Sequence, residues 1–200
     1  MTAQPEVAAT AADRVLGVIA CDEDMSCNRQ LIDPIVAAVG RRILQRYLIS
    51  VIETGPEHKK VCATDAWYWA QAVLVYEGFQ AFDARRPTPA SQAAYDDVAD
   101  LRGQYRIACL RAFVASQQTP TRERLAGGFL LKDERYPPNL HHLVAQARTI
   151  AKADPHRYEN LLSKEDDEIG LTIVHAGPQP GGPDGPPCEC VIERCSAAQR

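Results

Sequence analysis

The sequence predicts an all-α protein, and three observations support this fold class. Apolar residues recur every three or four positions through most of the chain before Glu165, as on one face of a helix. No segment in that part alternates apolar and polar residues like a half-buried strand. Proline and glycine separate the apolar segments at intervals typical of short helices. The 200 residues, 46% of them hydrophobic, are enough to bury one sizeable core.

The first part of the chain contains the signals for four helices. Asp33 and Pro34 form a start signal, because an aspartate caps free N–H groups and proline is tolerated in the first turn. Gly40 is a stop signal, and Gly55-Pro56 separates the next two segments. The helices are expected over residues 11–20, 34–39, 41–54 and 57–75. The clearest apolar stripe belongs to 41–54 and consists of Ile43, Leu44, Tyr47, Leu48, Val51 and Ile52.

The second part predicts one long helix and three shorter ones. The long helix is expected from Pro89 to about Gln117, and its second half is apolar on two sides, which is typical of a buried helix. Leu110 and Phe113 lie in that half and are the expected centre of the core. The shorter helices are expected from Thr119 to Gly127, after Pro137-Pro138, and from Asp154-Pro155 to about Leu162.

The change in composition after Leu162 divides the chain into three parts. Residues 1–10 are expected to be a flexible N-terminus, 11–162 a helical domain and 163–200 a flexible tail. The tail contains the acidic run 165–168, and nine of the twelve residues in 176–187 are Gly or Pro. Such a segment has almost no apolar area to offset the entropy of ordering, so a disordered tail is expected.

The cysteines and the start of the chain predict a cytoplasmic location. The sequence has seven cysteines, and an odd number without an export signal indicates reduced thiols rather than disulfides. Glu6 and Asp13 precede the first basic residue, Arg14, whereas a secretory signal begins with basic residues followed by a longer apolar stretch. No apolar run approaches the roughly 18 residues of a membrane span, so no membrane association is expected.

Several classes of function are disfavoured by the motifs and the charge. The chain has no glycine-rich phosphate loop, no dinucleotide fingerprint, no G-x-S-x-G and no H-E-x-x-H. With 22 basic and 26 acidic residues the net charge is −4, which argues against nucleic-acid binding. A protein that is not an enzyme and has no cofactor is favoured. An enzyme whose site is assembled from scattered residues, such as Arg122, His156 and Glu159, is an alternative.

Two segments partly resemble metal sites. Asp22 and Asp24 begin like a calcium loop, but Cys27 stands where the loop needs Gly and Asp33 where it needs Glu. A tail cluster could offer zinc three thiolates and one imidazole, although its C-x-C spacing is tighter than the usual C-x₂₋₄-C. This cluster consists of His175, Cys188, Cys190 and Cys195. No metal is expected, and a metal- or redox-responsive module using the tail cysteines is an alternative function.

The densest basic region lies close to consecutive aromatic residues. The basic residues are Arg41, Arg42, Arg46, Lys59 and Lys60. Trp67, Tyr68 and Trp69 spread over about 200° of a helix, so at least one ring should be near the surface. A basic rim beside an exposed aromatic would suit an acidic protein or peptide partner. The alternative interpretation is a solvated basic face with tryptophans in the core.

The order of short helices resembles HEAT-type helical-hairpin repeats over about residues 30–162. The stretches that carry the resemblance are Gly40-Arg41-Arg42 through Gly55, then Lys60 to Trp67, with Thr119-Pro120-Thr121-Arg122 and Leu125 similar in kind. The resemblance implies helical hairpins and a role as a scaffold or adaptor that binds a protein or peptide. An irregular α-bundle is the alternative architecture.

Overall fold

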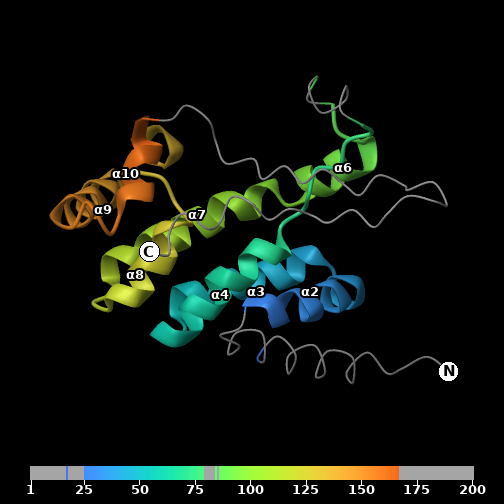
Figure 1. The fold of residues 1–200 in the computed structure, drawn as a ribbon, viewed down its shortest axis with the longest axis horizontal. Coiled ribbons are helices and arrows are strands. Elements are labelled where there is room, and N and C mark those ends of the chain that lie inside the picture. Colours follow the sequence, from blue (N-terminus) through green and yellow to red (C-terminus); the bar gives the residue numbers. More distant parts are fainter. Residues whose placement is uncertain (1–16, 18–24, 79–83, 85, 167–200) are drawn as a thin grey trace, which may run out of the picture.

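The computed structural model of the protein describes residues 17, 25–78, 84 and 86–166, and these residues form an all-α fold without a β-strand (Figure 1). The predicted fold class is therefore confirmed. The α-helices are α2 (Met25–Val39), α3 (Arg41–Thr54), α4 (Glu57–Ala70), α6 (Pro89–Asp97), α7 (Ala99–Ala115), α8 (Thr119–Ala126), α9 (His141–Ala153) and α10 (Glu159–Asp166). Two 3₁₀ turns, η1 (Asp133–Arg135) and η2 (Pro138–Leu140), lie between α8 and α9. The expected helix 11–20 and the tail from 167 fall outside the described residues, Gly17 excepted.

Helix α2 begins nine residues before the predicted start at Pro34, so the helix start and the cap expected at Asp33 and Pro34 were wrong. Pro34 lies inside the helix, where it removes a backbone hydrogen bond at a cost of about 3 kcal/mol. Ile32 and Ile35 flank it and are 1% and 6% exposed, so both pack into the core on either side of the proline. Burial of the two isoleucines offsets the cost of the proline.

Helix α4 ends at Ala70 and not at Val75 as predicted. The chain turns into extended backbone at Gln71 (φ −70°, ψ 147°). The extended segment is anchored at its far end, where the Val75 carbonyl accepts a 2.7 Å hydrogen bond from the Thr88 N–H and the Val75 N–H donates to Ser91 Oγ. Ala72 and Leu74 are buried. These tertiary contacts override the helical pattern of the sequence.

The predicted long helix 89–117 is two helices, because the chain bends at Val98 (φ −110°, ψ 17°). Two arginines satisfy carbonyls at the bend. Arg102 Nη1 donates to the Tyr95 carbonyl at 2.6 Å, and Arg42 donates to the Asp97 carbonyl. The side chain of Val98 is 1% exposed, so the bend also buries an apolar group.

The last helix begins later and ends later than predicted. The backbone turns after Asp154, and Asp154 Oδ1 accepts a hydrogen bond from the Arg157 N–H. The Asp-Pro pair therefore starts a turn, and α10 follows only at Glu159. Because α10 continues to Asp166, the predicted end at Leu162 was wrong and a domain boundary at 163 would lie within a helix.

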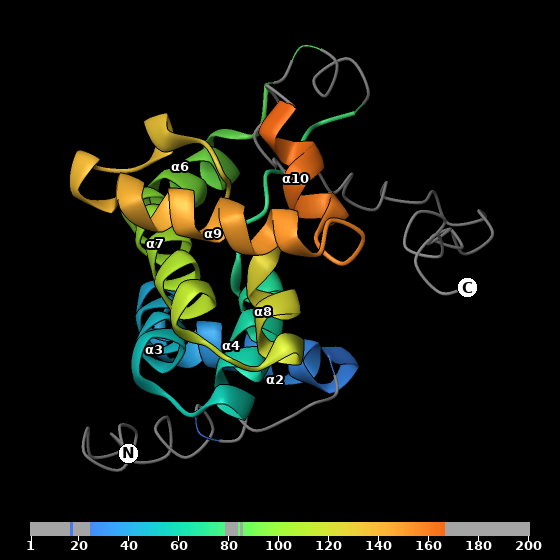
Figure 2. The same ribbon diagram turned by 90° about the vertical axis from the view of Figure 1, so that its left-hand side faces the viewer.

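Helix α7 is the central element of the fold. It packs against α3, α8 and α9, while α4 packs against α2, α3 and α8. Figure 1 and Figure 2 show α2, α3 and α4 on one side of α7, and α9 and α10 on the other. Leu110 and Phe113 are both 0% exposed, which confirms that the second half of the predicted long helix lies in the core. Of the described helices, none is long and apolar enough to cross a membrane.

Candidate functional site

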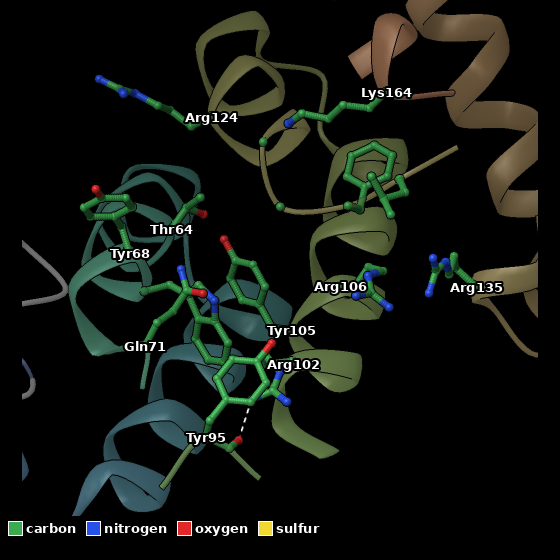
Figure 3. A pocket seen from close by; sticks show the side chains of 15 residues that line it. Thr64, Tyr68, Gln71, Tyr95, Arg102, Tyr105, Arg106, Arg124, Arg135 and Lys164 are labelled. Carbon is green, nitrogen blue, oxygen red and sulfur yellow. Dashed lines mark hydrogen bonds between the residues drawn. The ribbon is translucent and has the colours of Figure 1, made fainter. Parts of the chain in front are cut away.

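A cavity of about 510 Å³ opens between α4 and α7 and is bordered by residues from α6, α8, η1 and α10 (Figure 3). It is lined by Thr64, Trp67, Tyr68, Gln71, Tyr95, Arg102, Tyr105, Arg106, Arg124, Gly127, Gly128, Phe129, Leu130, Arg135 and Lys164. This volume lies in the range of pockets that bind small ligands or single side chains. The cavity is the strongest candidate site in the described part of the chain.

Helical spacing explains why these residues meet. Helix α4 contributes Thr64, Trp67 and Tyr68, which lie on one side of the helix, and Gln71 follows directly after its last residue. Helix α7 contributes a similar face, which consists of Arg102, Tyr105 and Arg106. Each of the two helices therefore turns one side toward the cavity and buries the other.

The floor of the cavity is a pair of stacked aromatic rings. The rings of Trp67 and Tyr105 are parallel within 2° and their centroids are 4.0 Å apart. Tyr105 is also hydrogen-bonded to the thiol of Cys109. Burial raises the pKa of Cys109 to about 12 and raises the pKa of Tyr105 well above its ordinary value. Both groups are therefore neutral at pH 7, and the floor supplies ring surface rather than charge.

All five charged residues of the lining are cations, and no carboxylate is among the lining residues that the structure describes. They are Arg102, Arg106, Arg124, Arg135 and Lys164. The whole chain has a net charge of −4, so the cavity has the opposite sign to the protein. A concave site lined by one sign of charge attracts ligands of the other sign.

Two of the cations have partners within the fold. The guanidinium of Arg102 lies 3.6 Å from the centroid of the Tyr95 ring and donates to the Tyr95 carbonyl. Arg124 Nη1 lies 3.6 Å from Oδ1 of the buried Asp65. Burial raises the pKa of Asp65, although Arg124 acts in the opposite direction. These two arginines are thus held in place at the edges of the cavity.

The other three cations, Arg106, Arg135 and Lys164, have no side-chain hydrogen bond or ion pair within residues 25–78 and 86–166. In Figure 3 the guanidinium ends of Arg106 and Arg135 face one another, whereas Lys164 lies apart from them and extends from α10 toward the side of the cavity where Arg124 lies. Lys164 is half-buried, and burial lowers its pKa. Among the described residues, therefore, none of these three cations is neutralised by an ion pair with a carboxylate.

Two of the predicted binding residues line the cavity. Trp67 is 4% exposed and forms part of the floor, as the core-anchor interpretation expected. Tyr68 is 39% exposed and makes an edge contact with Trp69, so it is the accessible ring of the three. The aromatic part of the predicted site is therefore next to a real concave surface.

The five basic residues predicted with them lie outside the lining. Three are engaged within the fold: Arg41 donates to the Ala70 and Gln71 carbonyls, Arg42 pairs with Asp100 at 2.9 Å, and Lys60 pairs with Glu57 at 3.1 Å. The other two, Arg46 and Lys59, also lie away from the cavity. The cations that line the cavity come from distant parts of the chain. Only Arg102 and Arg106 are four residues apart on one helix, so the sequence pattern could not have predicted the other three.

The residues of the alternative functions are not brought together. Arg122 Nε donates to the Phe113 carbonyl, whereas His156 and Glu159 are exposed. The tail cluster of His175 and the three cysteines lies outside the described residues. Asp33 lies within α2 and does not cap a helix. Within the described ranges, no group of three or more His, Cys, Asp or Glu side chains could hold a metal ion.

Comparison with known proteins gives no match. No protein family, no curated protein and no solved structure is similar to this chain. The charge, shape and chemistry of the cavity are therefore the indications of function that the molecule offers.

Proposed function

We propose that the protein is a non-enzymatic helical scaffold or adaptor of the cytosol that binds an acidic segment of a protein or peptide in this cavity. The observation that carries the proposal is a lining with five cations and no carboxylate, in a chain of net charge −4. Complementary charge of this kind speeds association and discriminates against partners of the wrong sign.

The chemistry of the lining favours binding over catalysis. The described lining residues include no histidine and no carboxylate that would act as a general base. Tyr105 and Cys109 are held neutral by burial, so neither is an activated nucleophile. Arginine and aromatic residues are the types most enriched where proteins bind proteins.

The helical arrangement and the thiols support the remaining parts of the proposal. Helices α3 and α4 are joined through Gly55-Pro56 and pack on one another, as in the helical hairpins of scaffold proteins. Neither Cys62 nor Cys109 is in a disulfide, and seven is an odd number of cysteines, which agrees with a reducing compartment.

The test uses a fluorescein-labelled octaglutamate peptide as the acidic probe, with fluorescence anisotropy over a salt series. The variant Arg106→Glu/Arg135→Glu reverses two cations of the cavity. The matched control Arg46→Glu/Lys59→Glu makes the same change of charge on the predicted basic face outside it. We expect the cavity variant to lose at least about tenfold in affinity, because the reversed charges repel the probe. Most of the salt dependence should be lost too, since it comes from the attraction between charges that salt screens, with a Debye length of about 8 Å at physiological ionic strength.

The control variant should keep both the affinity and the salt dependence. Circular dichroism should show equal helical content in all three proteins, since Arg, Lys and Glu have similar helix propensities. Equal binding by the wild type and the cavity variant would contradict the proposal. A loss confined to the control would place binding on the predicted basic face instead.

A further inference from the structure

Two arginines from different elements meet at one side of the cavity. Arg106 belongs to α7 and Arg135 to η1, and their guanidinium ends face one another in Figure 3. A second contact agrees with this placement, because the charge of Arg106 acts on Tyr136, the residue after Arg135. Burial raises the pKa of Tyr136 to about 12, while the Leu130 backbone and Arg106 act in the opposite direction. Helix α7 therefore directs Arg106 at the segment that carries Arg135.

The backbone that carries Arg135 is fixed before any ligand binds. The Tyr136 hydroxyl donates to the Leu130 carbonyl at 2.8 Å and accepts from the Leu130 N–H at 3.1 Å, which closes residues 130–136 into a loop. Leu131 and Tyr136 are 0% and 6% exposed, so both ends of the loop are anchored in the core. A ligand that binds Arg135 does not have to order this backbone, which lowers the entropic cost of binding.

The carboxylates nearest to Arg135 in the sequence do not neutralise the two arginines. Asp133 lies 3.8 Å from Arg148 and pairs with it, and Glu134 is exposed and outside the cavity lining. Within the part of the chain that the structure describes, neither Arg106 nor Arg135 has a side-chain hydrogen bond or ion pair. Two like charges that face one another repel, and an anion bound between them relieves the repulsion.

A phosphoryl group matches two facing guanidinium groups better than a carboxylate does. A carboxylate has one negative charge, so one of the two guanidinium charges would stay without a counter-charge. A phosphoryl group on a side chain has a charge near −2 and three strong acceptor oxygens. Each guanidinium offers a planar fork of donors that pairs with two oxygens of one such group.

We infer that Arg106 and Arg135 form a clamp that binds one phosphoryl dianion, as free phosphate or as a phosphorylated side chain of the acidic partner segment. For the phosphorylated segment, the inference rests on the proposed function and names the group that the cavity holds most tightly. Lys164 and Arg124 lie on another side of the cavity, where they attract the neighbouring carboxylates of the segment and do not contact the phosphoryl group.

The test compares three nine-residue acidic peptides that differ only at the central residue, which is phosphoserine, glutamate or serine. Binding to the full chain is measured by isothermal titration calorimetry, and inorganic phosphate is titrated in a separate experiment. We expect the phosphoserine peptide to bind at least about tenfold more tightly than the glutamate peptide, because a dianion pairs with both guanidinium groups. The glutamate and serine peptides should differ by less than about threefold.

Three variants locate the phosphoryl group. Arg106→Gln and Arg135→Gln each remove one guanidinium, so each should reduce the preference for phosphoserine over glutamate to less than about threefold. Lys164→Gln removes the same charge elsewhere in the cavity and is the matched control. It should weaken all three peptides by a similar factor and keep the preference. Arg135 is exposed, so Arg135→Gln should fold even if Arg106→Gln does not, and circular dichroism checks both.

The results also separate this inference from the proposed function. If phosphoserine and glutamate peptides bind equally, the clamp is overturned and the acidic-segment proposal stands. A preference for phosphoserine that survives both arginine variants, or is lost in Lys164→Gln, would also overturn the clamp.

The phosphate titration distinguishes the two sources of the dianion. If inorganic phosphate binds the wild type as tightly as the phosphoserine peptide does and does not bind Arg135→Gln, the clamp is supported with free phosphate as its ligand. If phosphate binds in this way and no peptide binds, the proposed function fails and the clamp stands. If neither phosphate nor any peptide binds, both fail.

Discussion

At the scale of single residues, Gly128 decides how closely the segment after α8 approaches the cavity floor. A Cβ at this position would lie 2.5 Å from Cys109 Sγ and 3.0 Å from Tyr105 Oη. Cys109 is 0% exposed and is packed in the core, so its thiol cannot move away without displacing neighbouring side chains. Glycine is thus required here for a close approach, and not for an unusual backbone angle.

Gly128→Ala should therefore destabilise the protein by about 1–3 kcal/mol, the usual cost of overpacking a core. Gly127→Ala is the matched control, because its Cβ would lie 3.6 Å from its nearest neighbour, the Arg124 carbonyl oxygen. That change should stay within about 0.5 kcal/mol. Urea unfolding of the two variants measures the difference. Equal midpoints would show that the floor yields to the added methyl group.

The second prediction at this scale concerns Asp65 and the dependence of stability on pH. Burial raises its pKa, so the folded state is penalised as the pH rises through this raised value and the carboxyl ionises. Near pH 3, below the ordinary Asp pKa of about 3.9, the carboxyl is protonated in both states and the penalty is absent. Asp65→Asn should then raise the Tm at pH 7 and leave it unchanged near pH 3, as followed by thermal melts.

Asp100 is the control, because its pKa is shifted in the opposite direction to that of Asp65. A hydrogen bond from Arg42 lowers its pKa, so its contribution to stability is present above the ordinary pKa and is lost as the pH falls. Asp100→Asn should lower the Tm at pH 7. If both substitutions shifted the Tm in the same direction at pH 7, the assignment of a buried, penalised charge to Asp65 would be wrong.

At the scale of helices, the sequence located elements well and their ends less well. Helix 41–54 matches its prediction at both ends because a local stripe and flanking glycines define it. The sequence pattern did not predict the bend at Val98. The bend is stabilised by side-chain hydrogen bonds from Arg42 and Arg102 to backbone carbonyls, and the bond from Arg42 joins residues 55 positions apart. Local periodicity contains no information on such contacts. Side chains of α3 and α7, not the sequence around 98, satisfy the carbonyls at that bend.

The end of α4 gives the prediction at this scale. Arg41 Nη1 donates to the Ala70 and Gln71 carbonyls at 2.7 and 2.6 Å, and Gln45 Nε2 donates to Ala70 at 2.9 Å. Arg41→Ala should destabilise the protein by about 1.5–3 kcal/mol, the range for hydrogen bonds from charged groups. Hydrogen exchange in residues 71–78 should accelerate more than in α9.

The matched control is Arg46→Ala on the same helix. Arg46 is exposed, so its removal should cost less than about 0.5 kcal/mol. Arg41→Lys should restore only part of the loss, because an ammonium group lacks the guanidinium fork. An Arg41→Ala protein with wild-type exchange rates would show that the carbonyls are satisfied without it.

At the scale of the whole molecule, the sequence predicted the core better than the site. The core was readable because α7 is apolar on two sides, which marks a central helix without reference to its neighbours. The cavity combines side chains from α4, α6, α7, α8, η1 and α10, and only the fold brings these elements together. Trp67 and Tyr68 were predicted because they belong to a run of aromatic residues. The predicted cations instead bind groups within the fold: Arg41 donates to the Ala70 carbonyl, and Lys60 pairs with Glu57.

Phe113 tests whether α7 makes the fold one cooperative unit. It is 0% exposed, and its ring lies 5.1 Å from that of Phe129 and 5.4 Å from that of Tyr158, centroid to centroid. Phe113→Ala should cost about 3–5 kcal/mol, whereas Ile43→Ala, at a site 54% exposed, should cost less than about 0.5 kcal/mol. Because α7 packs against helices on both sides, near- and far-ultraviolet circular dichroism should still melt together, at a lower temperature. Separate transitions for the two signals would show that tertiary packing and helices are lost in different steps, so that the fold is not one cooperative unit. An unchanged midpoint would show that the core lies elsewhere.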